Sequence, residues 1–156
     1  VKAELSPVTQ GAVVDDALQT SVEGVFACGN VLHVHDLVDF VSEESAKAGK
    51  AAADYVLGKS EAAQAVIRVA DGTGVRGVVP QRIRKFRDEK QTSAIRLRFR
   101  PDRVYQNVTV RVLDGEQTVR SVKKRILAPG EMVELLLPAE TVQKLSGQTL
   151  TVRIDE

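Results

Sequence analysis

The sequence has a single cysteine, no tryptophan and an aromatic content of only 4%. One cysteine cannot form an intramolecular disulfide, and it excludes a zinc site built from several cysteines. Because aromatic side chains are few, aliphatic residues and alanine must fill most of the core. The hydrophobic content of 43% is typical of a folded globular protein rather than a disordered one.

Long apolar runs are also lacking. No stretch approaches the roughly 20 residues that a helix needs to cross a bilayer. The first residues do not show the basic-then-apolar pattern of a signal peptide. We therefore expect a soluble, cytoplasmic protein without a membrane span.

The formal net charge of +1 averages two unlike parts of the chain. Residues 1–60 have a net charge of −5, whereas residues 61–156 have a net charge of +6. A shift of charge and pattern at one point is typical of a domain boundary. We therefore predict two domains, residues 1–60 and residues 61–156, with the boundary near Gly58–Glu61.

One helix is predicted in the first domain. Ser42 is the expected N-cap, because its side chain can accept a hydrogen bond from a free N–H of the first turn. Gly58 can adopt the left-handed conformation that ends a helix. The face through Ala46, Gly49 and Ala53 has almost no side-chain bulk. We therefore expect this face to lie very close to the structure that it packs on.

Beyond residue 64 the apolar period becomes that of a strand. Segments such as AIRLRFR and NVTVRVL alternate apolar and polar residues, and Asp114-Gly115 predicts a tight hairpin turn. About eight short strands can be counted, with one or two helical turns in AETVQKLSG before the last of them. This pattern predicts an antiparallel β-sandwich of immunoglobulin-like type.

The segment Gly72–Gly77 matches the G-x-G-x-x-G pattern of dinucleotide-binding proteins. That mechanism requires a helix to begin there, so that its N-terminus meets the pyrophosphate. The following residues, Val78-Val79-Pro80, continue as a strand instead. We interpret this segment as a β-turn loop rather than a phosphate site.

A more specific pattern lies between residues 6 and 58. It consists of Thr20, then Gly-Val-Phe-Ala-Cys-Gly-Asn at residues 24–30, then Gly-Lys-Ala-Ala-Ala at residues 49–53. These motifs resemble the C-terminal end of the FAD-binding domain in flavoprotein oxidoreductases of the glutathione- and thioredoxin-reductase superfamily. The segment HVHDLVDFVSEE is similar to FAD-dependent oxidoreductases encoded with anaerobic glycerol-3-phosphate dehydrogenases.

The resemblance implies an α+β protein: a partial FAD-binding, Rossmann-like remnant followed by the predicted β-sandwich. The implied function is electron transfer between NAD(P)H and an acceptor through FAD. The chain itself, as a fragment of such an enzyme, is expected to be inactive. Its expected partners are the remainder of the flavoprotein or a partner oxidoreductase subunit, and self-association into a homo-oligomer stays open.

The resemblance also implies cofactor-binding residues, namely Gly29, Asn30, Val41 and Ser42. Gly29 lets the backbone approach a ligand closely. Asn30 replaces the family's Asp, which hydrogen-bonds the ribityl chain of FAD, and the lost charge should weaken binding by about 1 kcal/mol. The amides of Val41 and Ser42 match the flavin-contacting position. Glu43 and Glu44 must then point away from the flavin, because their charge would oppose its reduction.

Two further groups of residues have alternative interpretations. Cys28 could be a redox thiol, but without a second cysteine nearby we interpret it as a small buried residue. His33 and His35 could begin a metal site, but no third ligand stands at a proper spacing, and we expect no metal. The other interpretations of the two histidines are a polar loop that lines the flavin or a subunit contact, and a role in proton handling.

The arginine-rich strands allow three hypotheses for residues 61–156. They could form a solvated face, dock onto an acidic partner such as residues 1–60, or bind nucleic acid. Interspersed acids and scarce aromatics make the nucleic-acid hypothesis the weakest. A β-sandwich interaction module without catalysis is the alternative to the flavoprotein function. The arginines concerned are Arg82, Arg84, Arg96, Arg98, Arg100, Arg103 and Arg111.

Overall fold

A computed structural model describes residues 2–86 and 93–156. The first part contains a 3-10 turn, η1 (Gly29–Val31), and a long helix, α1 (Val38–Val56). The remainder of the described chain consists of eight strands and one short helix. These elements are β1 (Ala65–Asp71), β2 (Val75–Val79), β3 (Arg82–Lys85), β4 (Ile95–Pro101), β5 (Tyr105–Asp114), β6 (Gln117–Leu127), β7 (Val133–Leu137), α2 (Ala139–Lys144) and β8 (Thr149–Asp155).

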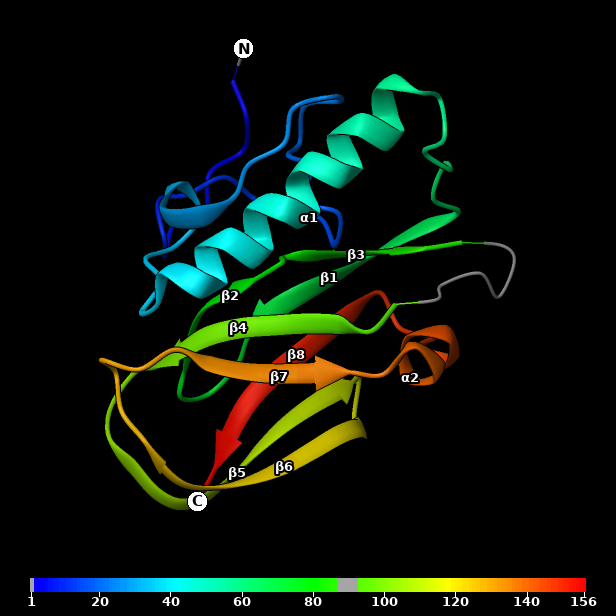
Figure 1. Cartoon of the computed structure of the whole chain (residues 1–156). Coiled ribbons are helices and arrows are strands. Elements are labelled where there is room, and N and C mark those ends of the chain that lie inside the picture. Colours follow the sequence, from blue (N-terminus) through cyan, green and yellow to red (C-terminus); the bar gives the residue numbers. More distant parts are fainter. Residues whose placement is uncertain (1, 87–92) are drawn as a thin grey trace.

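The eight strands form two sheets. Five strands pair in the order β3-β1-β8-β5-β6, and three pair in the order β2-β4-β7. Figure 1 shows α1 above these strands, with β4 and β7 in the middle and β5 and β6 on the side away from the helix. The main core lies between the sheets, where every second residue of a strand points inward. Its fully buried members include Leu97, Leu137, Val110, Val112 and Leu150.

The predicted strand-rich second part is confirmed, and the protein is an α+β protein with two mostly antiparallel sheets. The expectation of wholly antiparallel pairing is wrong at one ladder, because β1 and β8 run parallel. These strands come from the two ends of the region, so the chain between them can supply the long connection that parallel pairing needs. The immunoglobulin-like and Rossmann-like details stay predictions.

The loop at residues 72–77 confirms the sequence interpretation. Strand β2 begins at Val75, so no helix follows the glycines. The Asp71 carboxylate accepts hydrogen bonds from the backbone N–H groups of Gly77 and Val78, at 2.6 and 2.9 Å. The side chain of Asp71 therefore closes this loop.

The helix prediction is wrong at its start and confirmed at its end. Helix α1 begins at Val38, and the Ser42 hydroxyl donates to the Val38 carbonyl at 3.1 Å instead of capping an N-terminus. Asp39, in the first turn, suits the positive end of the helix dipole and helps to explain the earlier start. Gly58 has a φ of +67°, as a glycine that ends a helix commonly does.

The small-residue face of α1 packs on nothing in the described part of the chain, so the prediction for this face stays a prediction. Ala46, Gly49 and Ala53 are exposed, and a Cβ added at Gly49 would meet nothing within 4 Å. The buried residues of the helix are instead Glu44 and Ala48. Ala48 is buried in a second core, which is distinct from the core between the sheets. The members of this second core are Ala12, Val14, Leu18, Leu32, Ala48 and Val79.

The second core joins the two parts of the chain. Val79 from β2 packs among residues of the first part. Next to it, the backbone N–H groups of Gln81 and Arg82 donate to the Val14 carbonyl, and the Val14 N–H donates to the Gln81 side chain at 3.0 Å. Residues 11–20 are thus held to the strand region by both apolar packing and hydrogen bonds.

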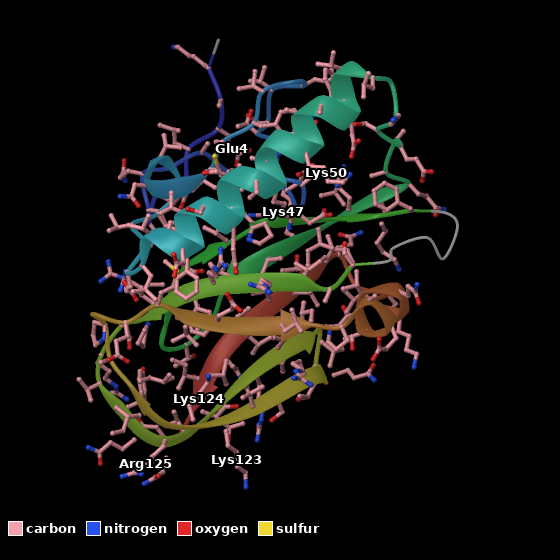
Figure 2. All side chains as sticks on the ribbon, in the orientation of Figure 1. Glu4, Lys47, Lys50, Lys123, Lys124 and Arg125 are labelled. Carbon is pink, nitrogen blue, oxygen red and sulfur yellow. The ribbon has the colours of Figure 1, made fainter. Side chains whose placement is uncertain are left out.

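Strand β6 is an edge of the five-stranded sheet and carries a run of cations. Figure 2 shows Lys123, Lys124 and Arg125 on β6, on the side of the protein away from α1. Charged residues on an edge strand disfavour pairing with another chain. Among the described residues, no helix is long and apolar enough to cross a membrane.

We predict that Leu97→Ala lowers the free energy of unfolding by about 3 kcal/mol, because Leu97 is fully buried between the sheets. Leu136→Ala on the neighbouring strand is the matched control, since Leu136 is 43% exposed and should lose less than about 1 kcal/mol. Urea denaturation of both variants measures the difference. Equal losses would contradict the placement of the core.

Candidate functional site

Ion pairs connect the basic strands to the acidic first part. Five of the seven arginines considered above reach carboxylates there: Arg82–Glu4, Arg84–Asp15 and Asp16, Arg96–Glu43, Arg98–Glu43 and Glu44, and Arg100–Asp36. The other two pair within the strand region, Arg103 with Glu156 and Arg111 with Asp155. The hypothesis that these arginines dock onto residues 1–60 is therefore confirmed for five of them. A continuous free arginine face for nucleic acid is not formed by this set.

The junction is the place where the loop at residues 29–37 and helix α1 meet strand β4. Glu44 lies at its centre and is 5% exposed. Its carboxylate accepts from the Gly29 backbone N–H at 2.6 Å and lies 3.0 Å from His35 Nε2. The other oxygen lies 3.4 Å from His33 Nε2 and 3.5 Å from Arg98 Nη1. Groups from η1, from the loop after it and from β4 thus converge on one buried carboxylate of α1.

The local fold explains how the loop reaches Glu44. Gly29 has a φ of +70°, and a Cβ at this position would lie 3.2 Å from Val41 Cγ1. A glycine therefore lets the chain turn tightly against the first turns of α1. After η1 the chain returns along the helix, which brings both imidazoles beside Glu44; their rings make an edge-on contact with centroids 4.5 Å apart.

The environment of Glu44 strongly favours its ionised form. Burial raises the pKa of this carboxyl, but the hydrogen bonds from His33, the Gly29 N–H and His35 outweigh it and lower the pKa to about 2. The pKa of Asp36, at the edge of the junction, is also lowered. Burial raises its pKa, but the Met132 N–H, at 2.6 Å, and Arg100 together outweigh burial and lower the pKa to below the usual range.

Arg98 is the cation at the centre of the junction and is 6% exposed. It contacts Glu44, Glu43 at 3.3 Å and Glu134 at 3.1 Å, and its guanidinium stacks over the Phe40 ring at 5.2 Å. Three carboxylates share this one arginine, so its charge is fully compensated inside the protein. Arg98 therefore fixes α1 to strand β4.

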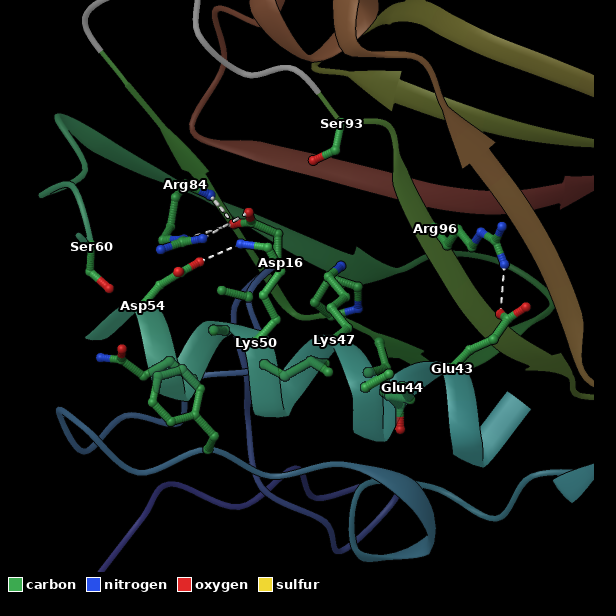
Figure 3. A pocket seen from close by; sticks show the side chains of 18 of the residues that line it. Asp16, Glu43, Glu44, Lys47, Lys50, Asp54, Ser60, Arg84, Ser93 and Arg96 are labelled. Atoms are coloured by element: carbon green, nitrogen blue, oxygen red, sulfur yellow. Dashed lines mark hydrogen bonds and ion pairs between the residues drawn. The ribbon is translucent and has the colours of Figure 1, made fainter. Parts of the chain in front are cut away.

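An open cleft of about 1120 Å³ lies between α1 and the strands. Figure 3 shows Lys47 and Lys50 on the helix side, and Arg84 and Arg96 on the strand side. Dashed contacts join Arg84 to Asp16 and Arg96 to Glu43 across the cleft. Glu44 and Arg98 also line this space, so the junction borders the cleft.

The four residues expected to bind the cofactor lie around the start of α1. Gly29 faces Val41, whose side chain leaves no room for a Cβ at residue 29 without a shift. Asn30 is exposed, and its Oδ1 accepts from the His35 N–H at 3.2 Å. Because α1 begins at Val38, the amides of Val41 and Ser42 lie within the helix, and the free N–H groups of the first turn belong to residues nearer Val38. Their cofactor-binding role stays a prediction.

Two details differ from the sequence interpretation of the loop. Cys28 is half-buried, with its Sγ 3.7 Å from Ser45 Oγ, and packs against the second core. Spacing along the sequence offers His33 and His35 no third ligand, but the fold does, because it places Glu44 beside them. One ligand atom from each of these three residues lies within 4.8 Å of the others. Sequence spacing missed Glu44 because it is on a different element.

Comparison of the chain with family models, curated proteins and solved structures finds no match.

We predict that Arg98→Met lowers the free energy of unfolding by about 3 kcal/mol or more, because it leaves buried Glu44 without its cationic partner. Arg103→Met is the control, since the Arg103–Glu156 pair is exposed and should contribute little to stability. Chemical denaturation at pH 7 compares them. A loss for Arg98→Met as small as that for Arg103→Met would contradict the central role of Arg98.

Acid should selectively weaken the contribution of Glu44. Its pKa is depressed in the folded protein, so its stabilisation is present above the unfolded value of about 4.5 and is lost as the pH falls towards about 2. We predict that Glu44→Gln is less stable than the wild type at pH 7. The difference should shrink by up to about 3 kcal/mol between pH 5 and pH 2.

Denaturation curves in the presence of a chelator measure this pH dependence. Glu61→Gln, at an exposed position, is the control and should keep a constant small difference from the wild type. A Glu44→Gln difference that stays constant over the same range would contradict the assignment.

Proposed function

We propose that residues 1–60 are the C-terminal part of the FAD-binding domain of a flavoprotein oxidoreductase, which passes electrons between NAD(P)H and an acceptor. One observation carries the proposal beside the sequence resemblance. Of the 19 residues of α1, all of them described, only Glu44 and Ala48 are buried. A helix that contributes so little to a core is expected to be covered by a further layer of protein.

The exposed surface around the start of α1 supports such a layer. Val38 is 79% exposed and Val34 is 65% exposed, and Val31 and Leu37 are exposed beside them in the sequence. Neighbouring exposed aliphatic side chains mark surfaces that pack against a partner or ligand. The small-residue face through Gly49 is open as well, so another element could approach α1 closely.

The residues at this surface fit a flavin. Asn30 is exposed, and the first turn of α1 presents free N–H groups at the positive end of the helix dipole. Asn30 would hydrogen-bond the ribityl chain, as the resemblance implies. When bound, FAD supplies the two-electron chemistry that connects NAD(P)H with the acceptor.

The placement of two glutamates supports the same proposal. A negative charge near the flavin would oppose its reduction, so Glu43 and Glu44 have to be held away from it. Glu43 pairs with Arg96 at 2.8 Å and with Arg98, while Glu44 is buried with the histidines. The strand region would thus keep these charges turned away from the cofactor surface.

In this proposal residues 61–156 form an appended β-domain, and the rest of the FAD site and the nicotinamide site belong to other residues of the enzyme. The sequence has no G-x-G-x-x-G that opens a helix. We therefore expect the 156 residues alone to bind FAD weakly or not at all. Submicromolar FAD binding by this chain would contradict that expectation.

The proposal is tested on the product of the whole coding region that contains this sequence. We expect it to purify with FAD and to show flavin reduction by NADH or NADPH. Asn30→Ala should weaken FAD binding, and Asn30→Asp should strengthen it by about fivefold, corresponding to about 1 kcal/mol. Gln64→Ala, at an exposed position, is the control. A protein that neither contains nor takes up FAD would overturn the proposal.

A further inference from the structure

We propose that His33, His35 and Glu44 form a binding site for one divalent transition-metal ion of the zinc type. The proposal concerns the interior of the junction and is independent of the flavin. It rests on the three converging side chains, which come from the loop after η1 and from α1. All three are nearly excluded from solvent, with side-chain exposures of 7%, 0% and 5%.

The distances suit a shared ion. In a tetrahedral site with bonds of about 2.0–2.1 Å, neighbouring ligand atoms are about 3.3 Å apart. His33 Nε2 lies 3.4 Å from one Glu44 oxygen, and His35 Nε2 lies 3.0 Å from the other. The candidate ligand atoms all lie within 4.8 Å of one another, so only small movements are needed to enclose an ion.

The hydrogen bonds of Glu44 can accommodate a bound metal ion. An ionised carboxylate has about four acceptor positions, and the four groups around it are the Gly29 N–H, Arg98 and the two imidazoles. With a metal, each neutral histidine would move its proton from Nε2 to Nδ1 and use Nε2 as a ligand. The Gly29 and Arg98 bonds would remain and orient the carboxylate, as outer partners of metal ligands do.

The buried Nδ1 atom of His35 is consistent with this proton shift. Among the described residues it has no hydrogen-bond partner. Moving the proton onto this atom gives up the hydrogen bond between His35 Nε2 and Glu44, which the bonds of both groups to the ion would replace. The tautomer of His35 is held only through Nε2, which is the atom that the metal would take.

The charges around the site explain how it could accept a cation near Arg98. Arg98 and Arg96 face three carboxylates, those of Glu43, Glu44 and Glu134. The cluster thus carries an excess of one negative charge before any ion binds. Two imidazoles and one carboxylate favour zinc, cobalt, nickel or copper over magnesium or calcium, which prefer oxygen ligands.

The site would have three protein ligands and one open position. Glu44 also lines the cleft between α1 and the strands, so this cleft is the natural route of entry for the ion. Three-ligand zinc sites keep water or a small ligand in the fourth position. The ion would also connect the loop and α1 at the point where β4 docks.

The test uses the untagged 156-residue chain after removal of metals with a chelator. Cobalt(II) is titrated while its visible absorption is followed, and zinc affinity is measured by competition with a coloured chelator. We expect one ion per chain, with a dissociation constant of about 10 µM or lower, and a rise in Tm when zinc is added. Absence of cobalt binding at 100 µM would overturn the proposal.

Variants locate the ion. His33→Gln, His35→Gln and Glu44→Gln should each weaken binding at least tenfold, whereas Glu61→Gln and Cys28→Ser, at positions outside the cluster, should leave it unchanged. Circular dichroism checks that each variant is folded. If Glu44→Gln does not fold, the two histidine variants decide the outcome. Binding that persists in both histidine variants would place the ion elsewhere and overturn the proposal.

Discussion

The buried carboxylate of Glu44 is the constraint on which the arrangement of this protein depends. An ionised group with 5% exposure must be fully hydrogen-bonded, because an unpaired buried charge is very costly. Its partners come from Gly29, from the two histidines and from Arg98 on β4. One side chain therefore fixes the turn at Gly29, the path of residues 33–35 and the docking of α1 on the strands.

The same junction has two sides with different chemistry. The inner side holds Glu44, the histidines and Arg98, where we propose a metal site. The outer side presents Asn30, the exposed aliphatic residues and the free N–H groups of α1, where we propose the flavin surface. Because exposed Asn30 directly follows Gly29, whose N–H is bonded to Glu44, the position of the outer surface depends on the inner hydrogen bonds.

Much of the architecture follows from local patterns. The alternation in segments such as residues 95–100, the Asp114-Gly115 turn and the left-handed Gly58 all predicted elements that the structure contains. The start of α1 did not follow, because a helix without a side-chain cap leaves no strong signal. The parallel pairing of β1 with β8 also depends on contacts between distant strands.

The sequence by itself determined the strand-rich second part, the long helix and the opposite charges of the two parts, since these depend on residues close together in the chain. It also identified His33 and His35 as notable residues. Only the tertiary structure decided that Glu44 is buried beside them and that Arg98 completes the cluster. The physical reason is that the pairing of charges depends on distance in space. Arg98 is 54 residues from Glu44 in the chain, and no local pattern encodes their meeting.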